Sequence, residues 1–269
     1  MKLHIMSDIH LEYYPNVSSI EQLLVKIPSL YDTCYNDNLK EIILVLAGDI
    51  GYILKNNYWN FLKDCCQKYK HVICIKGNHE YYITKKFNIK YNFDELEKIA
   101  QEKANNIENL YYLSNDKITL NGFTFLGTTM WYFTPDEYKL ITMSKINDYN
   151  YIYYNNTNIT TEFVNNINNL QTNWLLENIN TEQNNIIIIT HHLPIKELVH
   201  PKYDKYKDTL HSFVSTNLPN EIFSNKIKLW ICGHTHTPME CEYNNIKFIA
   251  NPIGYSGENI NPHLIEHEI

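Results

Sequence analysis

Residues 186–192 read Ile-Ile-Ile-Ile-Thr-His-His, and this stretch decides the fold class. Its apolar, β-branched side chains are typical of a strand that is buried on both faces. Further short apolar runs, each bounded by turn or polar residues, predict strands at 2–6, 42–47, 71–76 and 228–232. We therefore expect a sheet-based fold with buried central strands.

Helical patterns lie between these strands, at roughly 57–69, 94–106 and 160–179. The last of them follows Thr160, a residue type that caps helix N-termini, and its apolar residues recur at helical spacing, as expected of a face packed on the core. Hairpins are predicted over 117–128, turning at Asn121-Gly122, and over 239–250, turning at Asn244-Asn245. Strands that alternate with helices, with hairpins added, predict the α/β class.

The composition sets the size and limits the partners. The chain has 269 residues, a formal net charge of −7 and 44% hydrophobic residues, which is enough for one sizeable core. No internal repeat or linker divides it, so we expect a single domain over residues 1–269. All 23 basic residues are lysines. An acidic chain without arginine is not expected to bind duplex nucleic acid, because such binding depends on many basic contacts with phosphate.

Several features predict a cytoplasmic protein without a membrane partner. No stretch approaches the roughly 18 apolar residues of a membrane span. Asp8 interrupts the N-terminal segment before a signal-peptide core could form. The cysteines, which show no regular spacing, are Cys34, Cys65, Cys66, Cys74, Cys232 and Cys241. Cysteines within apolar strand-like runs are typical of buried, reduced thiols, which suits a reducing compartment.

Metal-competent side chains follow each of the five predicted strands. The segments are Asp8-Ile9-His10, Gly48-Asp49, Gly77-Asn78-His79-Glu80, His191-His192 and Gly233-His234-Thr235-His236. Half of the chain's 12 histidines lie in them. Because sites in open α/β sheets form at the carboxyl ends of strands, we expect these side chains to lie close together.

The spacing and the ligand types predict two metal ions. Residues i and i+2 of an extended segment point the same way, so Asp8 and His10 should reach one ion together, and His234 and His236 likewise. Carboxylate, imidazole and amide oxygen suit Mn²⁺, Fe or Zn²⁺, and the lack of cysteine ligands argues against a structural zinc site. The motifs offer more ligands than one ion takes, so a two-metal site is predicted, with an aspartate able to bridge.

Taken in order, the five motifs resemble those of the calcineurin-like metallophosphoesterase family, and the match runs over most of the chain. Residues 127–131 (GTTMW), 190–194 (THHLP) and 251–255 (NPIGY) further resemble a group of stand-alone bacterial-type members. In that group the last motif often reads Asn-Pro-Arg-Gly-Tyr, whereas this chain has Ile253 in place of the arginine. The resemblance implies a four-layer α-β-β-α sandwich of two mixed sheets, with a dinuclear metal site at the strand ends.

The resemblance also implies a ligand set. The ligands of one ion would be Asp8, His10 and His236, those of the other Asn78, His191 and His234, and Asp49 would bridge the two. Two divalent ions are implied, with Mn²⁺ in first place and Fe, Zn²⁺ or Ni²⁺ as alternatives. Taken singly, each of these residues has an ordinary structural alternative as a helix cap, a turn residue or a core residue.

His79 is implied to lie near the metal ions without binding them. In the family this histidine acts on the leaving-group oxygen, as an acid or as an electrostatic stabiliser, and the adjacent acidic residue, here Glu80, supports it. A donor that titrates near neutral pH suits the task. An ordinary helix-start carboxylate is the alternative for Glu80. The implied mechanism is in-line attack on phosphorus by a hydroxide that bridges the two ions.

The expected substrate is a small or nucleotide-like phosphodiester. Residues 131–159 form a polar-aromatic stretch of the length that is typical of lids or binding loops. Trp131 and Tyr81 are candidates for stacking on a base, and His192 for contact with substrate or support of the ligands. The alternative for the aromatic residues is plain packing, since a chain with 22 tyrosines has them in most segments.

Other activities are compatible with the same motifs. A phosphomonoesterase or protein phosphatase would use the same centre. A nuclease of the same superfamily would be expected to carry basic tracks, which the sequence lacks. A non-catalytic scaffold would be expected to have lost ligands or the catalytic histidine, whereas all are present. Because two divalent ions outweigh the charges of Asp8, Asp49 and a hydroxide, we expect the centre to stay positive without arginine.

Overall fold

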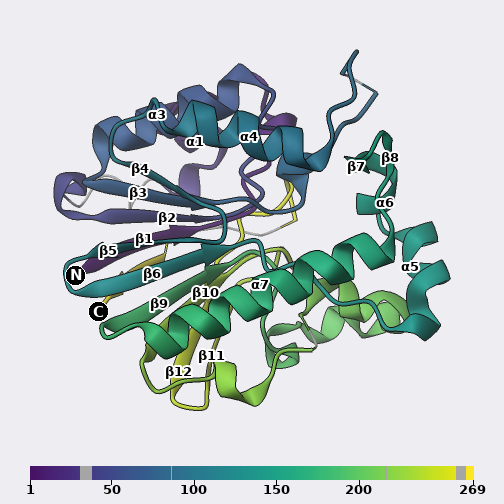
Figure 1. Ribbon diagram of the computed structural model, residues 1–269. Coiled ribbons are helices and arrows are strands. Elements are labelled where there is room, and N and C mark those ends of the chain that lie inside the picture. The colour runs from purple at the N-terminus through teal and green to yellow at the C-terminus, as the bar shows by residue number, and fades with distance from the viewer. Residues whose placement is uncertain (31–37, 86, 216, 259–264) are drawn as a thin grey trace.

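Two large β-sheets pack face to face in the computed structural model, which describes residues 1–30, 38–85, 87–215, 217–258 and 265–269 (Figure 1). The first sheet has the order β13 (Ile265–Glu268), β1 (Lys2–Met6), β2 (Ile43–Ala47), β3 (His71–Ile75) and β4 (Leu110–Leu113). The second has the order β11 (Met239–Tyr243), β12 (Ile246–Ala250), β10 (Ile227–Cys232), β9 (Asn185–Thr190), β6 (Phe123–Thr128) and β5 (Asp116–Leu120). A small hairpin, β7 (Tyr153–Tyr154) and β8 (Thr157–Asn158), stands apart from both.

Both sheets are mixed, with parallel central strands and antiparallel edges. β1 to β4 run parallel, and β13 pairs antiparallel with β1. In the second sheet, β12, β10, β9 and β6 run parallel, and the antiparallel edge strands are β11 and β5. Both predicted hairpins are confirmed, and their asparagines adopt the positive φ that tight two-residue turns require. All five predicted strands are confirmed to within a residue.

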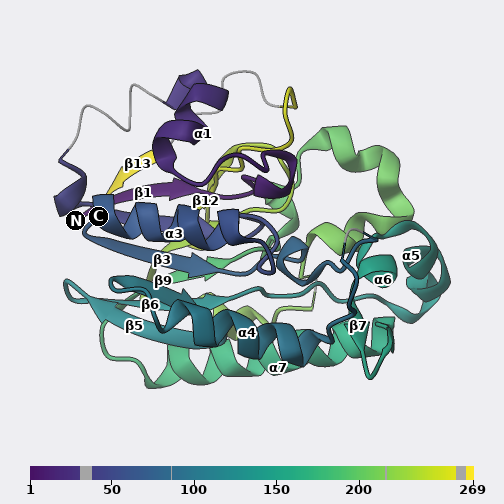
Figure 2. The ribbon, with the colours of Figure 1, turned by 90° about the horizontal axis from the view of Figure 1, so that it is seen from above.

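Helices cover the outer face of each sheet. α1 (Ile20–Lys26), α3 (Asn56–Lys68) and α4 (Phe93–Ala104) lie on the first sheet, and α7 (Thr161–Thr181) lies on the second (Figure 1). α5 (Lys139–Lys145) and α6 (Asp148–Tyr151) lie beyond the strand ends (Figures 1 and 2). The three predicted helices are confirmed. The Thr160 hydroxyl caps α7 by accepting from the N–H of Phe163, as its residue type indicates.

The buried apolar residues form layers that explain the architecture. Ile187 and Ile189 of β9 belong to the cluster between the two sheets, while Ile186 and Ile188 pack on the side that carries α7. This alternation follows from the two-residue period of a strand, and all four isoleucines are fully buried. The predicted four-layer α-β-β-α arrangement is therefore confirmed. The sequence pattern had not indicated α1, β4 or β13, which are short and, in β13, partly polar.

The described residues also bear on the predicted compartment and domain organisation. No helix among them is long and apolar enough to cross a bilayer. Their cysteines are free, and Cys74 and Cys232 are buried, as predicted; Cys65 and Cys66 are buried as well, and Cys34 lies outside the described residues. The single domain over residues 1–269 stays a prediction, which the core shared by the two sheets supports.

Candidate metal centre

The motif residues lie where the parallel strands end, on the side of α5 and α6 (Figures 1 and 2). Parallel strands bring their carboxyl ends to one edge of each sheet, so five segments that are distant in sequence meet there. Each motif residue follows its strand by one to five positions. The structure thus brings the seven predicted ligands into one region.

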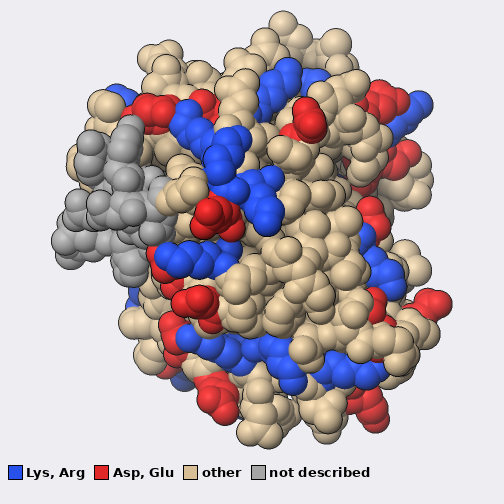
Figure 3. All heavy atoms as spheres, turned by 90° about the vertical axis from the view of Figure 1, so that its left-hand side faces the viewer, with Lys and Arg blue, Asp and Glu red and all other residues tan. Residues whose placement is uncertain are grey.

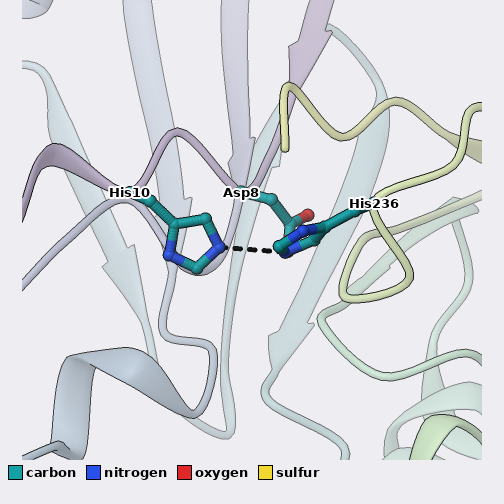
Figure 4. Close-up of side chains that lie close together, drawn as sticks. All are labelled: Asp8, His10 and His236. Carbon is teal, nitrogen blue, oxygen red and sulfur yellow. Dashed lines mark hydrogen bonds and ion pairs between the residues drawn. The ribbon is translucent and has the colours of Figure 1, made fainter. Parts of the chain in front are cut away.

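Asp8, His10 and His236 form the first group, which we call half-site one (Figure 4). Each offers one ligand atom, and these atoms lie within 4.8 Å of one another. The Nε2 atoms of His10 and His236 are 3.0 Å apart, and His236 Nε2 lies 3.4 Å from Asp8 Oδ1. All three residues are buried. They come from the ends of β1 and β10, so the two sheets build this group together.

Asn78, His191 and His234 form the second group, half-site two. His191 Nε2 lies 3.2 Å from Asn78 Oδ1 and 3.3 Å from His234 Nδ1. Asp49 Oδ2 lies 3.4 Å from His191 Nε2 and 3.8 Å from His10 Nε2. The carboxylate of Asp49 therefore stands between the two half-sites, as a bridging ligand must.

The backbone of these ligands corrects one step of the sequence argument. Asp8, His10, Asp49, His234 and His236 are not extended, because their φ angles lie between 46° and 72°, in the left-handed region. The chain turns sharply as each strand ends, and this turn, not an i, i+2 alternation, aims the side chains. A non-glycine residue held there costs about 1–3 kcal/mol, which is typical of functional sites.

Two glycines allow the carboxylates to approach the backbone. A Cβ on Gly77 would lie 2.2 Å from Asp49 Oδ1, and one on Gly233 would lie 2.7 Å from Asp8 Oδ2. Real Cβ atoms do not come so close to other heavy atoms. The glycines of the Gly-Asn-His-Glu and Gly-His-Thr-His motifs are therefore needed for space beside the ligands.

Two carboxylates that the sequence argument missed bind the outer nitrogens of half-site one. Glu12 Oε1 lies 2.9 Å from Nδ1 of His10, and Glu258 Oε2 lies 2.6 Å from Nδ1 of His236. Because a carboxylate accepts, both Nδ1 atoms donate, and each Nε2 lone pair points inward. Glu12 stands two residues after His10, a local signal that could have been found; Glu258 had none.

The inward-facing atoms fit divalent cations. His191 donates its Nδ1–H to the carbonyl of Ala47 at 2.9 Å, so its Nε2 lone pair faces the oxygens of Asp49 and Asn78. In half-site one, two Nε2 lone pairs face each other. Acceptors that face acceptors are stable only with a cation or a shared proton between them. Imidazole, carboxylate and amide oxygen are together a donor set for borderline divalent ions.

Nearby carboxylates raise the pKa values of two predicted ligands, whereas burial and a neighbouring histidine lower the pKa of a third. Burial lowers the pKa of His191 and of His236, but nearby carboxylates outweigh it and raise these pKa values to about 9 and about 10. For His234, burial and the neighbouring His191 lower the pKa to about 3. Burial raises the pKa of Glu12, but hydrogen bonds from His10 and His79 outweigh it and lower the pKa to about 2.

His79 lies beside the bridging position and is held from several sides. Its backbone N–H donates to Asp49 Oδ1 at 2.8 Å, and its Nε2 lies 4.0 Å from Asp49 Oδ2. Tyr82 stacks on its ring with centroids 4.3 Å apart. Its Nδ1 lies 2.9 Å from Glu12 Oε1, the oxygen that also binds His10. The histidine therefore lies beside the candidate centre, within a group with His10 and Glu12 that could itself hold an ion, and its role as a residue that does not bind metal stays a prediction.

Glu80 supports the backbone and does not touch the ring of His79. Its oxygens accept from the N–H groups of Asp49 at 3.0 Å, Ile50 at 2.8 Å and Gly77 at 2.7 Å. Burial and the nearby Asp49 raise the pKa of Glu80 to about 8, while the amide hydrogen bonds favour its ionised form. The support that the sequence predicts for His79 is indirect, through the two loops that carry Asp49 and His79.

The comparisons with known proteins agree with this geometry. A family model described as calcineurin-like phosphoesterase matches residues 1–238. The chain belongs to the calcineurin-like phosphoesterase family. It is 29% identical, over 97% of its length and 94% of the relative's, to an uncharacterised protein of Acanthamoeba polyphaga mimivirus. As a member of this family it is a metal-dependent phosphoric ester hydrolase.

Solved structures with low sequence identity share the fold. A phosphopantetheinyl hydrolase from Mycobacterium tuberculosis superposes with a TM-score of 0.62 at 14% identity, covering 96% of this chain and 90% of that one. A dimetal phosphatase from Danio rerio superposes with a TM-score of 0.59 at 14% identity, covering 99% of this chain and 91% of that one. These matches confirm the fold.

The three predicted substrate contacts of this phosphoesterase are buried. Tyr81 stacks on Phe93 with centroids 4.2 Å apart, and its hydroxyl donates to Glu97. The ring of Trp131 lies 5.4 Å from that of His192, whose ring lies 4.2 Å from the ligand His234. Packing and support of the ligands are the roles that these contacts indicate. Direct contact with substrate stays a prediction for all three.

Part of the polar-aromatic stretch 131–159 packs against half-site two. Asp148 at the start of α6 is buried and accepts from Asn78 Nδ2 at 2.8 Å, from the Tyr82 hydroxyl at 2.6 Å and from the Tyr132 hydroxyl at 3.0 Å. Because the amide nitrogen of Asn78 is held by Asp148, its oxygen turns toward His191. Asp148, which the sequence did not indicate, thus orients a predicted ligand.

Proposed function

We propose that this chain hydrolyses a small or nucleotide-like phosphodiester, using two divalent ions, Mn²⁺ first, held by half-sites one and two. The observation that carries the proposal is the convergence of six lone-pair donors around a seventh, Asp49, with His79 beside them. Buried acceptors that face one another are stable with a cation or a shared proton between them, and this donor set suits borderline divalent ions. The role of each ligand is part of the proposal.

The side chains divide the work of the reaction. When bound, two divalent ions supply a water of lowered pKa and positive charge for the phosphate oxygens. Half-site one and half-site two would each hold one ion, and Asp49, which lies between His10 and His191, would contact both. His79 Nε2 lies 4.0 Å from Asp49, and in this proposal it gives its proton to the leaving oxygen. The surrounding burial excludes bulk water from the ligands.

The charges around the centre support a diester as substrate. Glu12 and Glu258 add two negative charges to those of Asp8 and Asp49, so the centre is less positive than the sequence predicts. No lysine forms an ion pair with any of these four carboxylates among the described residues. Ile253, in the position where relatives often have arginine, is 2% exposed and offers phosphate no charge. A singly charged diester suits this centre better than a doubly charged monoester.

The charge of the chain does not favour a nuclease, because the formal net charge is −7 and none of the basic residues is arginine. On the face that the viewer sees in Figure 3, on the side of the two termini and away from the candidate centre, lysines are interspersed with acidic residues. Tracking a nucleic acid backbone needs a continuous basic groove. A scaffold role is not supported either, because all seven proposed ligands and His79 are in place. A small substrate is therefore the better proposal.

The test is a side-by-side assay of the Mn²⁺-reconstituted chain on an aryl phosphodiester, an aryl phosphomonoester and cyclic nucleotides. We expect the highest kcat/KM on a diester. His79→Ala should lower kcat by about 10²-fold or more on substrates with poor leaving groups, as expected when a general acid is lost. A preference for the monoester would overturn the diesterase proposal, and no turnover on any phosphoester despite two bound ions would favour the scaffold.

We also propose a cytoplasmic location. The free, buried cysteines support it, because structural disulfides are rare where glutathione and thioredoxin keep thiols reduced. Fractionation of cells that express the chain tests this proposal, and recovery in a secreted or membrane fraction would contradict it.

A further inference from the structure

We infer that Glu12, and not the adjacent Glu80, is the residue that positions His79 for proton transfer to the leaving group, and that the same oxygen ties His79 to the ligand His10. This inference deepens the proposed phosphodiesterase function and rests on it. Glu12 lies in the 3₁₀ turn Leu11–Tyr13, which directly follows the Asp8-Ile9-His10 motif. It is a positioning residue, because it acts through the two imidazoles.

The inference rests on the hydrogen bonds of one atom, Oε1 of Glu12. Glu12 Oε1 accepts from Nδ1 of His10 at 2.9 Å and from Nδ1 of His79 at 2.9 Å. The Glu12 side chain is 5% exposed, and the other oxygen, Oε2, is buried without a hydrogen-bond partner. A buried carboxylate oxygen that takes two ring N–H groups fixes the tautomer of both rings. Both Nε2 atoms are thereby left facing Asp49, at 3.8 Å and 4.0 Å.

The alternative partner of His79 is already occupied. Glu80 gives both of its oxygens to backbone amides, on Asp49 and Gly77 with one and on Ile50 with the other. Its side chain therefore shapes the two loops and leaves the ring free. Tyr82 stacks on the face of His79 but offers no acceptor to Nδ1. Among the described residues, Glu12 is the only carboxylate within hydrogen-bond distance of that nitrogen.

The arrangement defines the proton step. As the bond between phosphorus and the leaving oxygen breaks, its electron pair goes to that oxygen, and the Nε2 proton of His79 moves to the same atom. The ring ends neutral, with Nδ1–H still bonded to Glu12, so the carboxylate takes up no proton. A carboxylate behind an imidazole in this way holds the ring's orientation and stabilises its charged form before transfer.

Glu12→Gln and Glu258→Gln form a matched pair that isolates this role. Both substitutions remove a carboxylate from Nδ1 of an imidazole in half-site one, but only Glu12 also contacts His79. The Mn²⁺-reconstituted full chain and both variants would be assayed on aryl diesters whose leaving phenols span a range of pKa. Metal content would be measured for each, because loss of an outer carboxylate also weakens metal binding.

We expect Glu12→Gln to lower kcat about 10–100-fold for the poorest leaving groups and only a few-fold for the best, with KM little changed. Glu258→Gln should leave the dependence on the leaving group as in the wild type. Added to His79→Ala, Glu12→Gln should lower kcat by no more than about threefold at full metal occupancy, because the two residues act as one unit. Equal loss over the whole series of leaving groups would overturn the inference.

A second readout does not depend on turnover. In the Zn²⁺-loaded protein, ¹⁵N NMR of the imidazole nitrogens should show the proton of neutral His79 on Nδ1, and Glu12→Gln should shift part of the population to Nε2. An unchanged tautomer in Glu12→Gln would contradict the inference, even in a protein that turns over no phosphoester. Absence of all turnover with the expected tautomer shift would contradict the proposed function alone.

Discussion

Half-site one and half-site two are built from similar ligands but differ in the groups that accept hydrogen bonds from the outer nitrogens of their imidazoles. In half-site one, carboxylates accept from the outer nitrogens of both imidazoles, Glu12 from His10 and Glu258 from His236. In half-site two, His191 donates to the neutral carbonyl of Ala47. The third ligand differs as well, because half-site one has a carboxylate and half-site two has the amide of Asn78.

This difference shows how two half-sites with similar ligands can have different affinities for a divalent ion. Carboxylates behind an imidazole raise its basicity, so half-site one attracts a divalent ion more strongly than half-site two. Asn78 contributes only a dipole, and its orientation depends on Asp148. Half-site one is therefore expected to fill first in a metal titration, and half-site two at higher metal concentration.

The largest effect is expected from substitution of Asp49, which lies between the two half-sites. Asp49→Ala removes the oxygen that lies between His10 and His191 and the acceptor for the N–H of His79. Outer-shell substitutions alone cost 10–100-fold, so loss of a bridging ligand should lower kcat by more than about 100-fold. Metal content after desalting and turnover are the measurements. Asp49→Asn is the control that keeps the shape and tolerates the left-handed backbone. Retention of both ions and of turnover would show that Asp49 is not the bridge.

Glu258→Gln should reduce the difference in metal affinity between the two half-sites by weakening half-site one. The variant keeps an acceptor for Nδ1 of His236 but loses its charge. We expect the affinity for the tighter of two Mn²⁺ ions to fall about tenfold or more, with the weaker one unchanged. Calorimetric titration of the metal-free protein separates the two events. Equal weakening of both ions would contradict the assignment of Glu258 to one half-site.

The sequence predicted which side chains converge at the candidate centre because each has a local signal. An apolar run followed by histidine or aspartate marks both the strand and the side chain at its end, as in Ile189 and His191. The outer partners have no such signal, because Glu258 lies 22 residues from His236 and Asp148 lies 70 residues from Asn78. Which carboxylate reaches which ligand is decided by tertiary packing.

The sequence also predicted that Asp8 and His10 lie together, but by an incorrect geometric step. Asp8 and His10 do meet, but through left-handed turns and not through an extended segment. Few residues other than glycine adopt that backbone, although aspartate and histidine do so more often than most, and the surrounding contacts impose it here. Strained positions of this kind lie beyond any pattern of polarity, whereas the strands that lead to them, such as β1 and β9, follow the pattern closely.

Metal binding should release about one proton from each half-site, from His236 in half-site one and from His191 in half-site two. In the metal-free protein the pKa of His191 is raised to about 9 and that of His236 to about 10, so both are charged at pH 7.5. Metal binding requires neutral imidazoles, so about one proton leaves each half-site, and affinity rises about tenfold per pH unit for each ion. Because these pKa values are raised, their contribution to the stability of the metal-free fold is full below about pH 6.5 and is lost as pH rises through 9–10. Calorimetry in two buffers of different ionisation enthalpy counts the protons. Release of no protons at pH 7.5 would contradict the raised pKa values.

The smallest effect is expected from the residue that only orients a ligand. Asp148→Asn keeps an oxygen that can accept from Asn78 Nδ2 but removes the charge behind it, so the affinity for the weaker ion should fall by less than about tenfold, with the tighter ion unchanged. Tyr132→Phe is the matched control, since it removes one donor to Asp148 and leaves Asn78 untouched. A metal titration of both variants, with thermal unfolding to check the fold, is the measurement. If Asp148→Asn weakened the tighter ion instead, the division into two half-sites would have to be redrawn, because the carboxylate that orients Asn78 would then act on the wrong side of Asp49.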